Sequence, residues 1–435
     1  MRKYLMANFV LCLIIVFSTA CKKNRYRNQV SPEPVVVTPT PSPTNPPVQT
    51  TPSYEVGTGS GDLSIDGKSL DLTTIKLIKV KAGTYKSITI RNITGTAASP
   101  INVKNNGLVK VTEVMLTSNL AYVNIAGDND AALTYGFSFE NISFRAIKLE
   151  GKMSGVTLKS MNFKNVNDYC IAGENNNGAG LKYDGTANTR TDGFKILNCS
   201  FDNAGAIVFG GNLNKDTGED SGFFKDLEIA YNTFQNTESG TVCSFSNVQD
   251  YNIHHNVVNN LNNTNNNHNG IFYMQGNGKF HDNKLTNYQG NAIRMWVYSR
   301  GSSPATVEIY NNICYNTRKY GAFELQGFDR YIVSGKTTFV NAKVYNNTVG
   351  KMNTNKDWQG QVLDLYNYGG NLEFYNNLGF DLYNNNAAVT TMINNMSDVK
   401  IIKQENNKYS AKYSDVVSDL TKFVTVFTGL GASGI

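Results

Sequence analysis

Short segments of alternating apolar and polar residues recur along the chain, and an asparagine interrupts each of them. Residues 307–317 read VEIYNNICYNT, and the same order returns in LEIAYNTFQNT, YNIHHNVVNNL, KFHDNKLTNY, AKVYNNTVGK and LEFYNNLGFD. The apolar residues keep a period of two, which is typical of strands, and asparagine or glycine bounds each segment. The pattern therefore predicts short β-strands joined by tight bends.

The repeats align on one asparagine that follows the first strand of each unit. The aligned positions are Asn232, Asn256, Asn283, Asn312, Asn347 and Asn377, with Met161 and Cys199 at the same place in two earlier copies. Their spacings of 38, 33, 24, 27, 29, 35 and 30 residues are too irregular for a helical repeat. Each unit has room for three strands, which predicts an all-β, three-faced parallel β-helix. We expect the asparagines to adopt left-handed backbone angles and to bond to one another from coil to coil.

Residues 78–107, IKVKAGTYKSITIRNITGTAASPINVKNNG, resemble the first coils of the chondroitinase B and alginate lyase family, most clearly at GTY and SPI. This resemblance implies the right-handed parallel β-helix superfamily, which includes the pectate lyases, over roughly residues 60–410. The chain shows no counterpart of the lyase family's catalytic Lys and Arg motif, nor of the Asp-pair and Gly-His-Gly signature of polygalacturonases. The resemblance thus predicts the fold and neither activity.

The N-terminal segment is typical of an export signal. Residues 1–20 combine a basic start with an apolar run, over residues 9–17, that is too short to span a bilayer. STAC resembles the lipobox of bacterial lipoproteins, which implies cleavage before Cys21 and lipidation of its thiol, although Ser18 stands where leucine is usual. The alternative is an ordinary signal peptide that leaves Cys21 without a role.

Composition divides the rest of the chain into three parts. Residues 21–53 form a basic and Pro/Thr-rich tether, residues 54–410 the β-helix domain, and residues 411–435 an amphipathic cap. The cap carries a set of apolar residues that we expect to cover the last coil: Val416, Val417, Leu420, Phe423, Val424 and Phe427.

The formal charge of +6 is concentrated at the N-terminus. Residues 22–30 hold +4 and residues 54–435 only +1, so the basic excess lies beside the expected lipid anchor. That position suits an anionic membrane surface and excludes nucleic acid as a partner of the folded part. We expect a monomeric protein that is lipid-anchored in the cell envelope. Because Lys22 differs from the Asp of inner-membrane retention signals, the outer membrane is the favoured location.

Cysteine and acidic patterns give little support for a metal. Cys170, Cys199, Cys243 and Cys314 form no CxxC pair, and we expect buried free thiols. Residues 212–220, NLNKDTGED, place oxygen ligands at alternating positions as a calcium loop does, but Thr217 replaces the glycine of its sharp turn. A solvated loop is the favoured interpretation, and no cofactor is predicted.

Loop length points to the third strand of each unit. The asparagine bend stays short, whereas connections near the third strand expand at residues 173–193, 210–225, 260–269, 298–305, 327–341 and 350–360. A bend that must pair with its neighbours cannot lengthen, so the variable loops are free to carry function. The third-strand face is expected to form the floor of a groove between these loops.

Strand alternation predicts which residues line that floor. We place Ile207, Val242, Ile271, Ile293, Phe323 and Leu363 inward. The first outward row is then Val208, Cys243, Phe272, Arg294, Glu324 and Asp364, and the second is Gly210, Phe245, Met274, Trp296, Gln326 and Tyr366. Aromatic faces beside charged groups are typical of a sugar site.

Two classes of function fit these rows. In a polysaccharide lyase or glycoside hydrolase, Glu324 and Asp364 divide acid and base work, Arg294 holds an acidic sugar, and His268 is a reserve base. In a glycan-binding or scaffold protein the same residues hold a polysaccharide without cleaving it. Substrate-binding candidates in both are Phe245, Phe272, Trp296, Gln326 and Tyr366. A solvated Arg294–Glu324 salt bridge without any ligand is the third interpretation.

Overall fold

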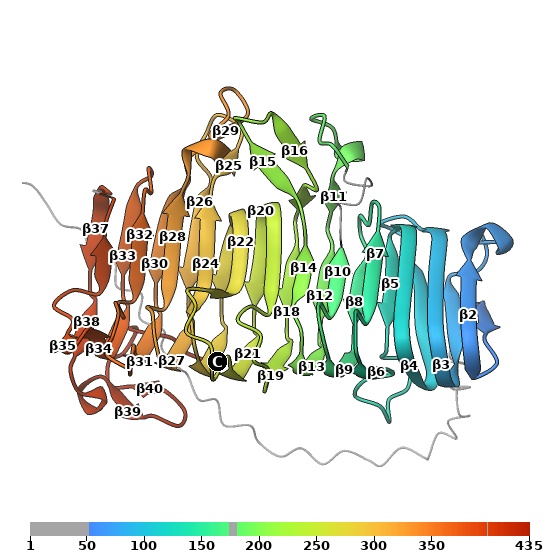
Figure 1. Cartoon of the computed structure of the whole chain (residues 1–435), viewed down its shortest axis with the longest axis horizontal. Coiled ribbons are helices and arrows are strands. Elements are labelled where there is room, and N and C mark those ends of the chain that lie inside the picture. Colours follow the sequence, from blue (N-terminus) through green and yellow to red (C-terminus); the bar gives the residue numbers. More distant parts are fainter. Residues whose placement is uncertain (1–51, 174–180, 398) are drawn as a thin grey trace, which may run out of the picture. The chain divides into compact units, whose positions relative to one another are not determined.

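The computed structural model describes residues 52–173, 181–397 and 399–435. The signal segment, Cys21 and almost all of the tether lie outside the described residues. Figure 1 shows the strands stacked side by side from β2 to β37, each beside its equivalent in the next coil. No helix among the described residues is long and apolar enough to cross a membrane.

Three parallel sheets run along the coils. The first sheet lies before the asparagine bend and contains β1 (Ser53–Val56), the starts of β3 (Leu77–Thr94) and β4 (Ile101–Ala121), β5 (Val123–Ala126), β8 (Thr157–Lys159), β12 (Lys195–Leu197), β18 (Glu228–Ala230), the ends of β20 (Cys243–His254) and β22 (Gly270–His281), β26 (Thr306–Tyr310), β30 (Asn341–Tyr345), β33 (Leu372–Tyr375) and β37 (Ile401–Glu405). The second sheet follows the bend and contains the middles of β3 and β4, β6 (Phe137–Ile142), β9 (Met161–Val166), β13 (Ser200–Ala204), β19 (Thr233–Gln235), β21 (Val257–Leu261), β23 (Lys284–Tyr288), β27 (Ile313–Thr317), β31 (Thr348–Met352), β34 (Leu378–Asn384) and β38 (Lys408–Ser410).

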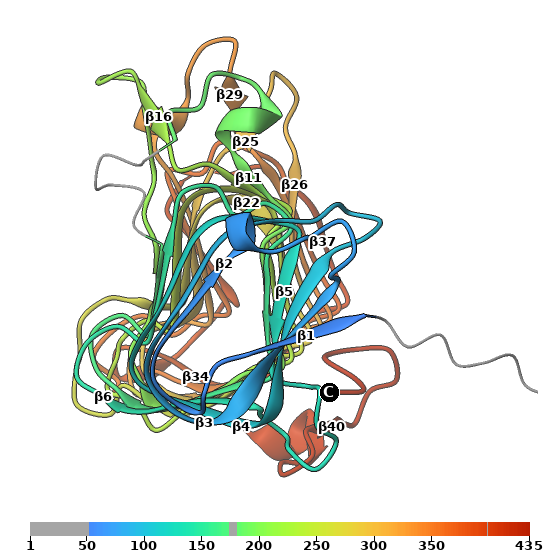
Figure 2. The same ribbon diagram turned by 90° about the vertical axis from the view of Figure 1, so that its right-hand side faces the viewer.

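The third sheet carries the face that the loop lengths single out. It contains β2 (Ser60–Asp66), the ends of β3 and β4, β7 (Ile147–Glu150), β10 (Ile171–Gly173), β14 (Ile207–Phe209), the starts of β20 and β22, β24 (Asn291–Val297), β28 (Phe323–Gly327), β32 (Leu363–Tyr366) and β36 (Ile393–Asn395). Viewed along the coils, the connections wind in the right-handed sense that parallel strands of one sheet favour (Figure 2). The predicted three-faced, right-handed parallel β-helix is confirmed.

Shorter elements lie in the connections. They are β11 (Thr191–Asp192) and β17 (Phe224–Lys225), the hairpins β15 (Asn212–Asn214)–β16 (Glu219–Ser221) and β39 (Val417–Asp419)–β40 (Val424–Thr425), the pair β25 (Ser299–Arg300)–β29 (Thr337–Thr338), β35 (Ala387–Ala388) against β34, and the 3-10 turns Gly67–Ser69, Ala187–Thr189, Asp329–Tyr331 and Tyr413–Asp415. Figure 2 shows β16, β25 and β29 gathered at one corner of the coil, where the third sheet passes into the first.

The asparagine ladder fixes the bend between the first and second sheets. The Nδ2 of Asn256 donates to Oδ1 of Asn283 at 3.0 Å, and Asn283 donates in the same way to Asn312 at 3.1 Å. The series runs from Asn232 to Asn407, and Cys199 joins it through its backbone N–H, which donates to Oδ1 of Asn232. These amides are buried and satisfied by one another, as predicted.

One detail of the ladder differs from the prediction. The left-handed backbone angle belongs to the residue before each ladder asparagine, such as Tyr231 (φ 59°) and Asp282 (φ 54°). The ladder asparagine itself stays outside that region, because its side chain must point inward to reach the next coil.

The interior is a continuous apolar column. Phe139, Phe163, Phe201 and Phe234 stack from coil to coil, with ring centroids 4.7–4.9 Å apart. This spacing equals the distance between hydrogen-bonded strands, so each ring covers the next. Cys170, Cys199, Cys243 and Cys314 are free and buried, which confirms the prediction for the thiols.

The C-terminal segment packs along the outer face of the second sheet. Its Val416 and Val417 contact Phe380, and its Phe423 contacts Ile313. The backbone N–H of Gly431 donates to the carbonyl of Asn376. The sequence predicts that this segment covers the last coil; in the structure its apolar side chains instead pack on Ile313 and Phe380 of the second sheet, which they bury.

Candidate functional site

The outer face of the third sheet carries two rows of polar and aromatic side chains, which we call the candidate face. Arg294, Glu324 and Asp364 pair directly with one another across β24, β28 and β32 and form the first row, as the alternation predicted. Asn394 on β36 continues that row. Two residues further along each strand, the second row contains Trp296, Gln326 and Tyr366. The structure thus brings together six of the predicted site residues.

The predicted rows are wrong at β20 and β22, where the true register lies one residue away. Cys243 pairs with Phe272, which pairs with Ile293, and both point inward, so Ser244 and Tyr273 take the outward places in the row of Arg294. Phe245 and Met274 also face the core, and both phenylalanines are 0% exposed. Phe245 and Phe272 therefore cannot contact a substrate.

The cause of this error is local. TVCSF and GIFYMQ each place two buried apolar residues in succession, and no charged residue follows them to mark the outward position. Either alternation is then compatible with the sequence, and a shift of one residue exchanges the two faces. The same shift hid Tyr273 and Gln275, which pair with Arg294 and Trp296.

Glu324 is the centre of a charged cluster. Its side chain is 1% exposed; Oε1 lies 2.7 Å from Nε of Arg294, and Oε2 lies 2.7 Å from Nε2 of His268. Burial alone would raise the pKa of Glu324, but the contacts with His268 and Arg294 outweigh burial and hold that pKa below its usual value. Glu324 is therefore an ionised carboxylate, whose Oε1 accepts a hydrogen bond from Arg294 and whose Oε2 lies in contact with His268 without hydrogen-bond geometry.

His268 comes from the loop between the second and third sheets. Its Nε2 also lies 3.0 Å from Oδ1 of Asn291, and its ring stacks on Tyr320 with centroids 4.3 Å apart. The side chain is 30% exposed, and no hydrogen bond joins its Nδ1 to another described residue. With the Nε2 proton directed to Asn291 and in contact with Glu324, Nδ1 carries the free lone pair.

Arg294 is held from three sides. Besides Glu324, it donates to the carbonyl of His268 at 3.2 Å and to Oε1 of Gln326 at 3.4 Å. Its side chain is partly exposed, so the guanidinium keeps an outer edge toward solvent. A guanidinium fixed in this way is suited to bind a carboxylate without moving.

Asp364 lies beneath the surface of the same row. It is 4% exposed and accepts a hydrogen bond from Nδ2 of Asn394 at 3.0 Å. Burial raises its pKa to about 8, and the charge of Glu324 adds to the rise. At neutral pH this carboxyl is largely protonated, in contrast to its ionised neighbour Glu324.

A cluster of aromatic rings borders the candidate face on its second-row side. Trp296 packs edge-on against Tyr273 and Phe328, with centroids 5.0 and 4.9 Å apart. The Arg330 guanidinium lies 4.7–5.0 Å from the centroids of Trp296, Phe328 and Tyr331. No ion pair joins Arg330 to a carboxylate among the described residues, so its charge is balanced only by ring faces and the Tyr331 hydroxyl.

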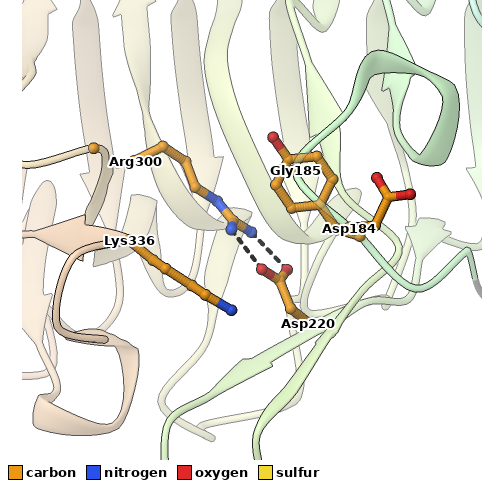
Figure 3. Close-up of a pocket in the computed structure, with 7 residues that line it drawn as sticks. Asp184, Gly185, Asp220, Arg300 and Lys336 are labelled. Carbon is orange, nitrogen blue, oxygen red and sulfur yellow. Dashed lines mark hydrogen bonds and ion pairs between the residues drawn. The ribbon is translucent and has the colours of Figure 1, made fainter.

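A separate pocket of about 310 Å³ lies in the loops at the corner of the coil. Figure 3 shows Arg300 and Asp220 facing each other across it, with bonds of 2.6 and 2.8 Å between guanidinium and carboxylate. Arg300 also bonds to Oδ1 of Asn247 and lies against the rings of Tyr183 and Phe223. These contacts tie three loops together, so this ion pair is structural.

The suspected calcium loop is the hairpin β15–β16. Asp220 is committed to Arg300, and Nδ2 of Asn212 donates to Glu219 at 2.6 Å. Asp220 and Glu219 are thus both engaged by protein donors. Among the described residues, no group of three or more His, Cys, Asp or Glu side chains could hold a metal ion.

The stacked parallel sheets and their internal asparagine ladder define a right-handed parallel β-helix protein. No family model and no curated protein matches the chain. Among solved structures, the chain is similar to the A-module of the mannuronan C-5 epimerase AlgE4 from Azotobacter vinelandii. The sequence identity is 13%, over 77% of this chain and 90% of that chain, and the TM-score is 0.24.

Proposed function

We propose that the candidate face binds a polysaccharide containing uronate units and cleaves it by β-elimination, with His268 as the base. The observation that carries this proposal is the contact between Nε2 of His268 and the ionised, buried Glu324. A carboxylate in contact with one ring nitrogen favours the proton on that nitrogen, which leaves the other nitrogen as a base. Arg294 stands beside the same carboxylate, with its outer edge available for the carboxylate of a sugar.

The reaction would proceed without a cofactor. Nδ1 of His268 takes the proton from the carbon that bears the sugar carboxylate, while Arg294 stabilises the negative charge that develops on that group. The electron pair forms a carbon–carbon double bond as the glycosidic oxygen leaves from the adjacent carbon. The departing oxygen receives the proton of the imidazolium, directly or through one water molecule, which restores neutral His268.

A glycoside hydrolase is less well supported by the geometry. Hydrolases place two carboxyl groups on either side of the scissile bond, one of them free to attack or to activate water. Here the oxygens of Glu324 face Arg294 and His268, and Asp364 is 4% exposed. Neither carboxyl has the access that this chemistry needs, whereas His268 is partly exposed.

Glycan binding without cleavage is the second candidate. The Arg294–Glu324 ion pair favours it, because this pair would hold a binding surface rigid in the same way as an active site. The Arg330 cluster and Tyr366 would contact a bound chain in either case.

The test is an assay of the purified protein on a panel of uronate-containing polysaccharides, read by the ultraviolet absorbance of unsaturated products. His268→Gln should abolish product formation and retain binding. If the wild type and His268→Gln both bind the polysaccharide and the wild type forms no product, the protein is a glycan-binding protein and not a lyase. New reducing ends without unsaturated product would indicate a hydrolase.

We also propose that the protein is anchored to the cell envelope through a lipid on Cys21, with the Pro/Thr-rich segment as a spacer. The support is the short apolar segment that ends in STAC and the basic residues directly after it. The Pro/Thr-rich composition of residues 21–53 is that of a spacer between an anchor and a folded domain.

A further inference from the structure

A second pocket lies at the C-terminal end of the candidate face. It has a volume of about 660 Å³ and is lined by Gln361, Asn384, Asn385, Ala387, Ala388, Val389, Thr390, Thr391, Ile393, Asn394 and Asn395. Asn394 belongs to this pocket and also to the first row, where it pairs with Asp364. The pocket therefore continues the row that carries Glu324 and Arg294, two coils further along the sheet.

None of the lining residues carries a charge. Five are asparagine or glutamine and two are threonine, so the pocket offers both donors and acceptors of hydrogen bonds. Four are alanine, valine or isoleucine and supply an apolar wall. This differs from the His268 end of the face, where Arg294, Arg330 and His268 gather.

One buried group among the lining residues has no partner in the part of the chain that the structure describes. Oε1 of Gln361 makes no hydrogen bond there, although the residue is only 4% exposed. A buried acceptor without a donor destabilises the fold unless a ligand supplies the donor. Hydroxyl groups of a sugar are donors of the required kind.

An acidic sugar would gain no ion pair in this pocket and would lose its hydration there. Asp364, which separates the pocket from Glu324, is itself largely uncharged at neutral pH because burial raises its pKa to about 8. A neutral sugar, in contrast, can match its hydroxyls to the amides and its C–H surface to Ala388, Val389 and Ile393. The two ends of the face thus differ in the charge of the unit that they would accept.

We propose that this pocket binds a neutral sugar unit, so that the substrate is a mixed polysaccharide in which uronate and neutral units occur in one chain. This inference rests on the proposed function, which assigns the uronate to the Arg294 and His268 end. A polymer made of uronate alone has no neutral unit to fill this pocket and should therefore bind less tightly.

The test compares two classes of size-matched oligosaccharide by calorimetry on the whole protein carrying Cys21→Ser. One class is all uronate, such as oligogalacturonate, and the other alternates uronate with a neutral sugar, as in hyaluronan fragments. The wild type should bind an alternating member at least tenfold more tightly than any all-uronate member. Asn384→Ala with Thr391→Ala should remove most of that preference and leave all-uronate binding within twofold.

Two further variants separate recognition from folding. Gln361→Met removes the unpartnered oxygen, so it should raise the melting temperature while it weakens binding of the alternating oligosaccharide. The matched control is Thr233→Ala with Gln235→Ala, an equivalent pair on the outer face of the second sheet, where neither side chain contributes to the pocket. This control should bind like the wild type.

The outcomes distinguish the two proposals. If both classes bind equally, and Arg294→Gln but not the pocket variants weakens binding, the neutral pocket is refuted and the uronate site stands. Tighter binding of the all-uronate class refutes it as well. If neither class binds to the wild type, both proposals fail together.

Discussion

His268 and Glu324 meet at 2.7 Å between Nε2 and Oε2, although one comes from a loop and the other from the middle of a strand. The strand fixes Glu324 through its pairing with Arg294 and Asp364, and the loop presents His268 to it from the side. A buried carboxylate that faces a partly exposed imidazole directs the reactivity of the imidazole outward.

Glu324→Gln tests this relationship. The amide keeps the shape of the carboxylate but cannot hold the imidazole in the same tautomer with the same strength, so turnover should fall by about 100-fold or more with little change in KM. The rate on the polysaccharide that the wild type cleaves is the measurement. Glu308→Gln is the matched control, because Glu308 forms a surface ion pair with Lys279 on the first sheet. Equal rates for the two variants would show that Glu324 only stabilises the fold.

The stability of the protein should depend on the protonation of Asp364. Its pKa in the folded protein, about 8, stands above its value in an unfolded chain, so the folded state binds the proton more tightly. The stabilising contribution is complete below about pH 4 and is lost as the pH rises through about 8. Asp364→Asn mimics the protonated form, so its melting temperature should fall less than that of the wild type between neutral and alkaline pH. Parallel melting curves for the two proteins over this range would refute the assignment.

Arg330→Gln should weaken the binding of acidic oligosaccharides by roughly tenfold and reduce the salt dependence of binding. The guanidinium is positioned by three rings and lacks a carboxylate partner among the described residues, so its charge is available to a ligand. Lys343→Gln, which removes a charge paired with Glu373 on the first sheet, is the control. An effect of equal size in both variants would mean that the net charge of the protein, and not this position, governs binding.

The fold could be predicted from the sequence because an asparagine recurs at one fixed place between two short strands of period-two pattern. A parallel β-helix explains this recurrence, since its bends stack from coil to coil. The sequence also predicted the row of Arg294, Glu324 and Asp364, since each of these charged residues stands between two inward apolar residues of its strand and so marks the outward position. At β20 and β22 the alternation is ambiguous, so Phe245 and Phe272 were predicted to point outward although both point inward.

The contacts of the site could not be predicted in the same way. His268 and Arg330 lie in connections whose paths depend on the loops beside them, and no periodic pattern constrains a loop. The burial of Asp364 depends on Asn394 from the next coil, which covers it. These residues come from different coils, so no single stretch of the sequence determines the distances between them.

The lipid anchor is tested by Cys21→Ser. Without the thiol no lipid can be attached, so the protein should leave the membrane fraction and its mature mass should lack the acyl groups. A variant with Lys22 and Lys23 replaced by glutamine keeps Cys21 and should remain in the membrane fraction. Unchanged fractionation and mass in Cys21→Ser would exclude the anchor.

Asn283→Ala tests the ladder as the source of the register. Asn283 is 0% exposed; its Oδ1 accepts from the backbone N–H and the Nδ2 of Asn256, and its Nδ2 donates to the carbonyl of Ile253. Alanine leaves these buried groups unpaired, at a cost of about 1–3 kcal/mol in the free energy of unfolding. Asn266→Ala is the control, because that exposed side chain makes only a 3.3 Å contact with Arg318 and its loss should change stability by less than about 0.5 kcal/mol. Denaturant unfolding of both variants measures the difference. If they unfold at the same denaturant concentration, the ladder contributes no more than a surface asparagine, and the apolar column of stacked rings must hold the coils in register by itself.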